Sequence, residues 1–287
     1  MKVIHTAEAL GIALNKIQGK GNFGFIPTMG ALHEGHISLV KRSIIENEFT
    51  ICSIFVNQKQ FNNTADFEKY PSTIESDLAK LASAKCDIVF VPTNDQIYPK
   101  GFISPYYALG NIENVLEGFY RPGHFQGVCI VVNRLLDLIK PSKMYLGLKD
   151  YQQCMVIQKM LELIGLDKSI KLCFVETIRD AQGLALSSRN LRLSEDAKRK
   201  ALVLINSLKK AKDILIKNTN AELSTIKAAA IKDILNAGFE SVDYFDFIDQ
   251  HFDLIKSNEE SKNTIAILTA ATIEGVRLID NIQIYTT

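Results

Sequence analysis

The chain has 287 residues and a formal net charge of +1, from 33 basic and 32 acidic side chains. Hydrophobic residues make up 47% of the sequence and charged residues 23%, which is typical of a globular protein with a sizeable core. The balanced charge and the lack of a long basic run argue against nucleic acid as a partner, and no apolar stretch is long enough to cross a membrane.

The start of the chain and its cysteines predict a cytoplasmic protein. No secretory leader precedes Val3 and Ile4. Five cysteines are scattered along the chain, most of them in apolar runs, at positions 52, 86, 129, 154 and 173. We expect them to be reduced core residues rather than partners in disulfides.

Hydrophobic spacing predicts alternating strands and helices in the first part of the chain. Short apolar runs indicate strands at 23–26, 51–56, 87–91, 144–146 and 170–175. Helical spacing indicates helices at 6–17, from about 36 to 45, and at 72–84, 124–139 and 151–164. Ser72 and Glu75 frame a capping box for the third of these helices. This alternation predicts an α/β fold with a doubly wound, Rossmann-like parallel sheet.

The remainder of the chain has a different pattern. Two amphipathic helices are expected around 201–215 and 223–238, followed by strands near 242–248, 264–270 and 277–279. Strands without intervening helices suggest a small antiparallel sheet. We therefore expect a Rossmann-like domain over 1–179 and a smaller α+β lid domain over 180–287.

The stretch from Phe25 to His36 is a strand–loop–helix unit with glycines and histidines at its turn. Backbone N–H groups at a helix N-terminus attract phosphate, and protonated or hydrogen-bonding imidazoles would add donors there. The pair His33 and His36 could instead bind zinc or lie idle on the surface. No third ligand has suitable spacing nearby, so the sequence predicts no dedicated metal site.

Polar side chains follow the second and fourth of these strands. Asn57 and Gln60 come after one strand, and Lys149 and Gln153 after the other. Because ligands bind beyond the carboxyl ends of parallel strands, these residues are candidates for holding a small polar substrate, with lysine suited to phosphate. Of the neighbours Gln152 and Gln153, one should point to the cleft and the other outward. A plain solvated loop remains the alternative for Asn57 and Gln60.

Two further segments are ambiguous by themselves. Arg121 and His124 stand at the start of a helix, where they face either an anion or solvent. The polar segment Ser187-Ser188-Arg189 offers hydroxyl donors and a charged fork suited to phosphoryl transfer, but it also fits a serine-rich linker.

Taken together, five separated motifs resemble those of the pantoate–β-alanine ligase (pantothenate synthetase) family, in the His-x-Gly-His adenylyl-transfer superfamily. The motifs are Pro27 to Gly30 with His33 and His36; Ser53 to Asn57 with Gln60 and Phe61; Arg121 to Phe125; Gly147 with Lys149, Asp150, Gln152 and Gln153; and Asp180 to Gly183 with Leu186 to Asn190. The resemblance covers nearly the whole chain.

The resemblance implies a role for each motif. It implies that ATP contacts Met29, Gly30, Ala31, Leu32, His33, Glu34, Gly35, His36, Gly147, Leu148, Lys149, Asp150, Ile178, Leu186, Ser187, Ser188 and Arg189. It implies that pantoate contacts Gln60 and Gln153, with Asn57 beside them, and that β-alanine lies by Gln60. The expected catalytic residues are His36 as proton donor, His33, Lys149, Ser187, Ser188 and Arg189.

The implied reaction joins pantoate to β-alanine through a pantoyl adenylate, releasing pyrophosphate and then AMP. Mg²⁺ is expected with ATP, and the family leads us to expect a homodimer with small-molecule substrates. The sequence departs from the family pattern at Leu148, where glutamate is usual, and at Gln58, where proline is usual. Two competing interpretations are another nucleotidyltransferase of the superfamily and a non-catalytic nucleotide sensor.

Overall fold

The computed structural model describes residues 1–17, 19, 21–62, 64–218, 221–255, 260 and 264–284. The chain divides into two compact units. Unit 1 comprises Met1–Leu109 and Arg121–Ile178, and unit 2 comprises Gly110–Tyr120 and Arg179–Thr287. The crossing after Ile178 falls next to the boundary expected from the sequence, whereas residues 110–120 had been expected in the first domain.

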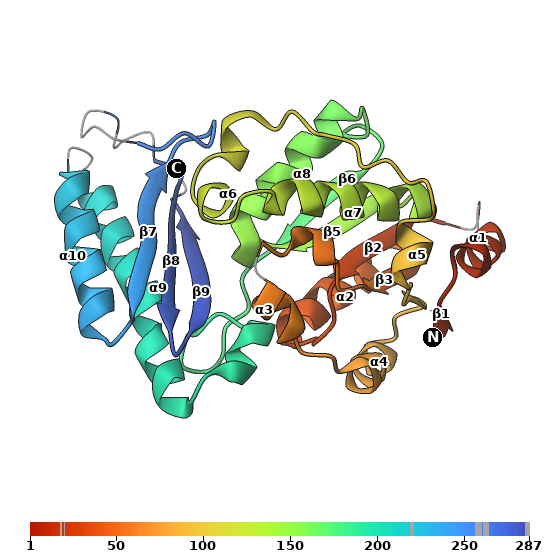
Figure 1. The fold of residues 1–287 in the computed structure, drawn as a ribbon, viewed down its shortest axis with the longest axis horizontal. Helices are drawn as coiled ribbons and strands as arrows, with labels where there is room; N and C mark the ends of the chain where they lie inside the picture. The colour runs from red at the N-terminus through yellow and green to blue at the C-terminus, as the bar shows by residue number, and fades with distance from the viewer. Residues whose placement is uncertain are drawn as a thin grey trace. The chain divides into compact units, whose positions relative to one another are not determined.

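Unit 1 is built on a six-stranded sheet in which every pairing is parallel (Figure 1). The strands, in spatial order, are β1 (Lys2–Ile4), β4 (Ile88–Phe90), β3 (Phe49–Ile54), β2 (Phe23–Thr28), β5 (Lys143–Gly147) and β6 (Lys171–Val175). The prediction of a doubly wound sheet is confirmed. The short edge strand β1 was not predicted, because three residues are too few to show a period.

Helices cover both faces of this sheet. The long ones are α1 (Ala7–Asn15), α2 (Glu34–Glu46), α4 (Ile74–Ser83), α7 (His124–Ile139) and α8 (Tyr151–Leu163). Helices α2 and α4 contact one another, and α7 contacts both α1 and α8 on the other face (Figure 1). Shorter turns are α3 (Thr64–Glu68), α5 (Asn94–Ile97), η1 (Gln58–Gln60) and η3 (Leu148–Asp150).

The order of the strands fixes where a ligand can bind. Strand β2 pairs with β3 on one side and with β5 on the other. From β2 the chain winds outward through β3 and β4, and it later returns to β5 and winds the other way. Ligands of such sheets bind at this switch point, beyond the carboxyl ends of the strands. The residues that follow β2, β3 and β5 are therefore the candidates for binding a ligand.

Unit 2 packs two helices on a three-stranded antiparallel sheet. Helices α9 (Glu195–Lys217) and α10 (Leu223–Asn236) contact β7 (Ser241–Ile248), β8 (Ala266–Ile273) and β9 (Val276–Gln283) (Figure 1). Ser194 is the N-cap of α9, and its side chain accepts the N–H of Ala197 at 3.1 Å. The predicted antiparallel sheet is confirmed.

A segment from the middle of the sequence belongs to unit 2. It contains η2 (Gly110–Glu113) and α6 (Glu117–Tyr120). The buried carboxylate of Glu117 accepts two hydrogen bonds from Arg277, at 2.9 and 2.6 Å, and one from the hydroxyl of Tyr244 at 2.7 Å. These contacts explain why residues 110–120 separate from the rest of the first half of the chain.

The state of the cysteines and the character of the described helices match what the sequence predicts. All five cysteines are free; four are buried and Cys173 is half-buried. Burial is the main cause that raises the pKa of the Cys86 thiol to about 12. Among the helices in the described part of the chain, none combines the length and the apolar character needed to cross a membrane.

Candidate functional site

The two histidines after β2 form the first turn of α2. His33 is the N-cap residue, and its Nδ1 accepts the N–H of Gly35 at 3.1 Å. His36 is the third residue of the helix, and its Nδ1 accepts the N–H of His33 at 3.3 Å. This is a reciprocal capping box in which imidazoles stand where serine and glutamate usually do. Helix α2 therefore begins at Glu34, slightly earlier than predicted.

Gly35 leaves room for the ring of His33. A Cβ atom at position 35 would lie 2.8 Å from Cε1 and 2.9 Å from Nδ1 of that ring. The rings of His33 and His36 lie against each other, with centroids 4.1 Å apart and planes tilted by 43°. Glycine thus lets the imidazoles fold back onto the helix start.

These hydrogen bonds fix the protonation of both rings. Each Nδ1 accepts a backbone N–H and therefore carries no proton, so each neutral ring carries its proton on Nε2. Burial, followed by the charge of Lys149, lowers the pKa of His33 to about 4. Burial, followed by the neighbouring His33, lowers the pKa of His36 to about 3. At neutral pH the pair offers two Nε2–H donors rather than imidazolium ions.

In the loop before this helix, the N–H groups of residues 30 to 32 are bonded within unit 1. The N–H of Gly30 points to Thr28 Oγ1 at 3.3 Å, and those of Ala31 and Leu32 each lie 2.8 Å from the carboxylate of Asp77. The side-chain donors at this turn are the two imidazoles, and Lys149 is close enough to lower both of their pKa values.

Asp77 is a site residue that the sequence analysis missed. It lies on α4, is 1% exposed, and also accepts a hydrogen bond from Thr73 Oγ1 at 3.1 Å. The predicted capping box of Ser72 and Glu75 is wrong: the N-cap is Thr73, and its side chain makes no capping bond. The available signal was an aspartate on the same helical face as apolar neighbours three and four residues away.

Gln60 is held from several directions at the end of β3. Its side chain accepts Nδ2 of Asn57 at 3.2 Å and donates from Nε2 to the sulfur of Met29 at 2.7 Å. Its backbone oxygen accepts Nδ1 of His124 at 2.7 Å. The Arg121 guanidinium contacts Nε2 of that ring at 3.2 Å. Arg121 and His124 thus support Gln60 within unit 1.

Both the Nδ2 and the Oδ1 atom of Asn57 make hydrogen bonds within the protein. Nδ2 also donates to the oxygen of Gly127 at 3.0 Å, and Oδ1 accepts the Tyr98 hydroxyl at 2.8 Å and the N–H of Lys59 at 3.3 Å. Gly127 has no room for a side chain, because a Cβ there would lie 2.2 Å from the backbone oxygen of Lys59. Asn57 consequently ties turn η1 to α7.

The turn after β5 carries the lysine. Lys149 and Asp150 lie in η3, with Nζ 3.4 Å from Oδ1 of Asp150. Leu148 is 9% exposed, so the residue that replaces the usual glutamate is buried. Gln153 is half-buried on α8, and Gln152 is 2% exposed, so the expectation that one of the two amides faces outward is wrong.

The Ser-Ser-Arg segment belongs to unit 2, and the residues that precede it are held by several hydrogen bonds. Arg179 makes a double contact with the buried carboxylate of Asp280, at 2.7 and 2.8 Å. Asp180 Oδ1 accepts the backbone N–H groups of residues 182, 183 and 184. Ser187 caps η4 (Ser188–Arg192) by accepting the N–H of Arg189 at 3.3 Å. The predicted ATP residues therefore divide between the units, with Ile178 the last residue of unit 1.

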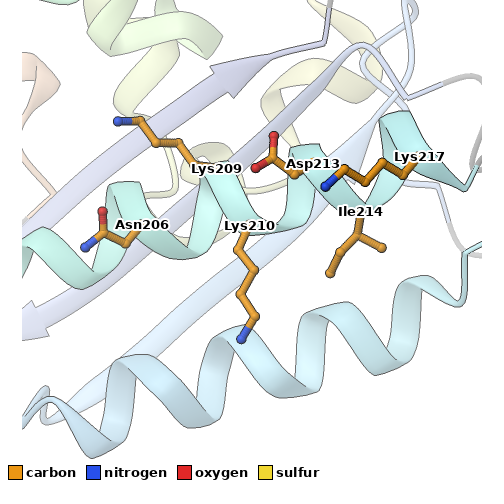
Figure 2. A pocket seen from close by; sticks show the side chains of 6 residues that line it. All are labelled: Asn206, Lys209, Lys210, Asp213, Ile214 and Lys217. Atoms are coloured by element: carbon orange, nitrogen blue, oxygen red, sulfur yellow. The ribbon is translucent and has the colours of Figure 1, made fainter.

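Two hollows differ in what lines them. One of about 370 Å³ lies in unit 1 against Met29, Gly30, Ala31 and Asp77, at the carboxyl ends of β2 to β4. The histidines, Gln60, Gln153 and Lys149 are outside its lining. The other lies along α9 and is lined by the six residues of Figure 2, half of them lysines. It includes no residue of the motifs described above. Across the described residues, no group of three His, Cys, Asp or Glu could hold a metal ion.

Comparison with known proteins gives a consistent result. The sequence model of the pantoate–β-alanine ligase family matches residues 2–283. A pantothenate synthetase of Cereibacter sphaeroides is 42% identical over 283 residues, 98% of this chain and 99% of the relative. One of Fervidobacterium nodosum is 37% identical over 285 residues, 99% of each chain.

Solved structures agree over the whole chain. The pantothenate synthetase of Thermus thermophilus superposes with a TM-score of 0.89 at 33% identity, covering 100% of both chains. The enzyme of Francisella tularensis, solved with β,γ-ATP and β-alanine, gives a TM-score of 0.77 at 35% identity, covering 100% of this chain and 99% of that one. The chain belongs to the pantoate–β-alanine ligase family.

Proposed function

We propose that the chain is a pantothenate synthetase that condenses pantoate with β-alanine at the expense of ATP, releasing AMP and pyrophosphate. The observation that carries the proposal is the imidazole capping box at the switch point of the sheet, with two neutral Nε2–H donors near Lys149. The family membership, and a relative solved with an ATP ligand and β-alanine, support the choice of substrates.

The proposed reaction has two steps. A carboxylate oxygen of pantoate attacks the α-phosphorus of ATP, and the bond to the bridging oxygen breaks to release pyrophosphate. The amine of β-alanine then attacks the carbonyl carbon of the adenylate, loses a proton, and expels AMP. The first step is needed because a carboxylate is a poor electrophile and AMP is a good leaving group.

The residues of unit 1 support the first step by hydrogen bonding and charge. His33 and His36 would donate Nε2–H bonds to phosphate oxygens as charge shifts to the leaving group, and Lys149 would add a point charge. Because both histidines are neutral, His36 would stabilise the transition state as a hydrogen-bond donor rather than as an imidazolium acid. We propose that Ser187, Ser188 and Arg189 bind the same nucleotide, with the guanidinium neutralising pyrophosphate.

The amide groups account for the acid substrate. Sulfur is a weak acceptor, so Nε2 of Gln60 can exchange Met29 for a carboxylate or hydroxyl oxygen of pantoate. We assign Gln153 to the same substrate, and the β-alanine position to Gln60. Asn57, which the sequence placed with pantoate, would position Gln60 through their mutual hydrogen bond.

Three finer features are part of the proposal. Mg²⁺ would reach the site bound to ATP, with ligands from phosphate and water, since the described residues offer no group of three suitable side chains. A homodimer is supported by exposed apolar side chains in unit 1, such as Ile103 and Tyr106, and light scattering would test it. A cytoplasmic location is supported by the five free cysteines.

Isotope exchange tests the proposal. The protein should exchange labelled pyrophosphate into ATP when pantoate is present, without β-alanine, and ¹⁸O from the pantoate carboxylate should appear in AMP after full turnover. Arg189→Ala should slow the exchange, while Gln153→Ala should chiefly raise the pantoate concentration required. Formation of ADP and phosphate, with no exchange under any substrate pair, would reject the adenylate route.

A further inference from the structure

Two side chains of helix α4 hydrogen-bond to N–H and carbonyl groups of the loop that leads to the histidines. Near its start, the Asp77 carboxylate accepts the N–H groups of Ala31 and Leu32, each at 2.8 Å. One turn further along, Nζ of Lys80 donates to the carbonyl oxygen of Leu32 at 2.5 Å. The two residues are three apart, so they share one face of the helix. The loop is thereby held at consecutive backbone groups.

Part of this loop has an unfavourable backbone conformation. Gly30 and Ala31 both have positive φ angles, +83° and +48°. For alanine this left-handed conformation is unfavourable by about 1 kcal/mol or more. A buried carboxylate that satisfies the two following N–H groups offsets that cost. Helix α4 thus helps to determine the conformation of the loop.

A single peptide group connects Lys80 to His36. The carbonyl oxygen of the Leu32–His33 peptide accepts Nζ of Lys80, and the N–H of the same peptide donates to Nδ1 of His36. A cation at the carbonyl end polarises the peptide and strengthens the bond made by its N–H end. Lys80 is therefore connected to the ring of His36 without touching it.

We propose that α4 is a positioning element for adenylyl transfer: Asp77 and Lys80 hold the loop from Gly30 to His33 so that the paired imidazoles present their Nε2–H groups to the nucleotide. The role in catalysis rests on the proposed function. Neither residue needs to touch a substrate. Asp77 fixes the path of the loop, and Lys80 fixes the peptide that orients His36.

Kinetics of single variants give the first test. Asp77→Asn keeps the shape of the side chain but turns one acceptor into a donor, which opposes one of the two loop N–H groups. Lys80→Met keeps the aliphatic stem and removes the donor. Each should slow pantoate-dependent pyrophosphate exchange about tenfold or more, on the scale of a lost charged hydrogen bond, and leave the pantoate KM within about twofold. Glu75→Gln, an exposed charge on the same helix, is the matched control.

A double variant separates positioning from direct contact. If Lys80 acts through His36, then Lys80→Met should slow exchange about tenfold in the wild-type background and less than about twofold in a His36→Gln background. Equal losses in the two backgrounds would overturn the proposal, because Lys80 would then act on the nucleotide independently. Lys80 is exposed, so this variant should fold even where Asp77→Asn does not.

Imidazole ¹⁵N spectra test the same point without activity. His36 in the wild type should show Nε2 protonated and Nδ1 as an acceptor, and Lys80→Met should shift this ring toward a mixture of tautomers while Glu75→Gln leaves it unchanged. An identical His36 spectrum in wild type and Lys80→Met would refute the positioning role. If the wild type exchanges no pyrophosphate at all, the proposed function fails, whereas these spectra still decide whether α4 orients the ring.

Discussion

The neutral histidine pair makes unit 1 sensitive to acid in a defined pH window. Both imidazoles have an ordinary pKa of 6.5 in the unfolded chain, and folding lowers it to about 4 for His33 and about 3 for His36. Below pH 6.5 the unfolded state therefore binds more protons than the folded state, so stability falls as pH falls. The contribution is present above pH 6.5 and is lost progressively down to the folded pKa values.

The size of this effect follows from the shifts. At pH 5 each ring is protonated in the unfolded chain and neutral in the folded one, which costs about 1.4 kcal/mol per pH unit below 6.5, or about 2 kcal/mol per histidine. The pair should therefore lower the free energy of unfolding by about 4 kcal/mol between pH 7.5 and pH 5. Most carboxylates remain ionised in this window, so the histidines can be observed separately.

His36→Gln tests the reasoning, because glutamine at the third helical position can still cap the N–H of His33 but does not titrate. Urea unfolding, followed by circular dichroism at pH 5.0, 5.5, 6.0 and 7.5, should show about 2 kcal/mol less acid destabilisation in this variant. His251→Gln, which removes an exposed imidazole of unit 2, is the control. With only five histidines in the chain, NMR titration can assign His36 directly. A His36 resonance that titrates near pH 6.5, or an unchanged stability profile, would refute the structural account.

Three further predictions concern the histidine turn and the turn after β5. His36→Ala should lower turnover by on the order of 10² to 10³, the usual cost of losing a transition-state donor, and activity within twofold of wild type would contradict a catalytic role. Gly35→Ala should slow pyrophosphate exchange because its Cβ would lie 2.8 Å from the ring of His33, although alanine normally favours helix; unaltered exchange would show that the ring moves freely. Lys149→Ala should weaken ATP binding in calorimetry tenfold or more, whereas Leu148→Glu should leave it nearly unchanged; much tighter binding by the glutamate variant would show that Leu148 is not neutral.

Hydrophobic patterning was enough to predict five of the six strands of unit 1, because the central strands are mostly buried. The helices were predicted because each has one apolar stripe. Hydrophobic patterning could not assign residues 110–120 to unit 2. That assignment depends on Glu117 meeting Arg277 and Tyr244, which are 160 and 127 positions away in sequence. Such contacts leave no local pattern. A glutamate in a short irregular segment reads as a solvated charge until its partners are known.

The site shows the same limit at shorter range. The motifs indicated His33, His36, Lys149 and Gln60, because their residue types suit phosphate and a small acid. Asp77 was overlooked because an acidic residue in the first turn of a helix is explained well enough by the helix dipole. Its real partners are N–H groups more than forty positions away. Candidate residues for the chemistry can be named from sequence, whereas the residues that hold them in place are recognised only in the fold.

The spacing of His-x-Gly-His follows from helix geometry as much as from chemistry. A reciprocal capping box needs side-chain acceptors at the N-cap and at the third helical position, which is a separation of three. Imidazole is unusual in this role, because after accepting through Nδ1 it still has an N–H on the opposite side of the ring. Ionised glutamate would satisfy the cap but leave no donor for a phosphate, and serine would have only the proton on the same oxygen that accepts. The glycine is then needed so that the first ring can fold over the helix start. One arrangement therefore starts helix α2, fixes both tautomers and supplies two donors from rings that are neutral near pH 6.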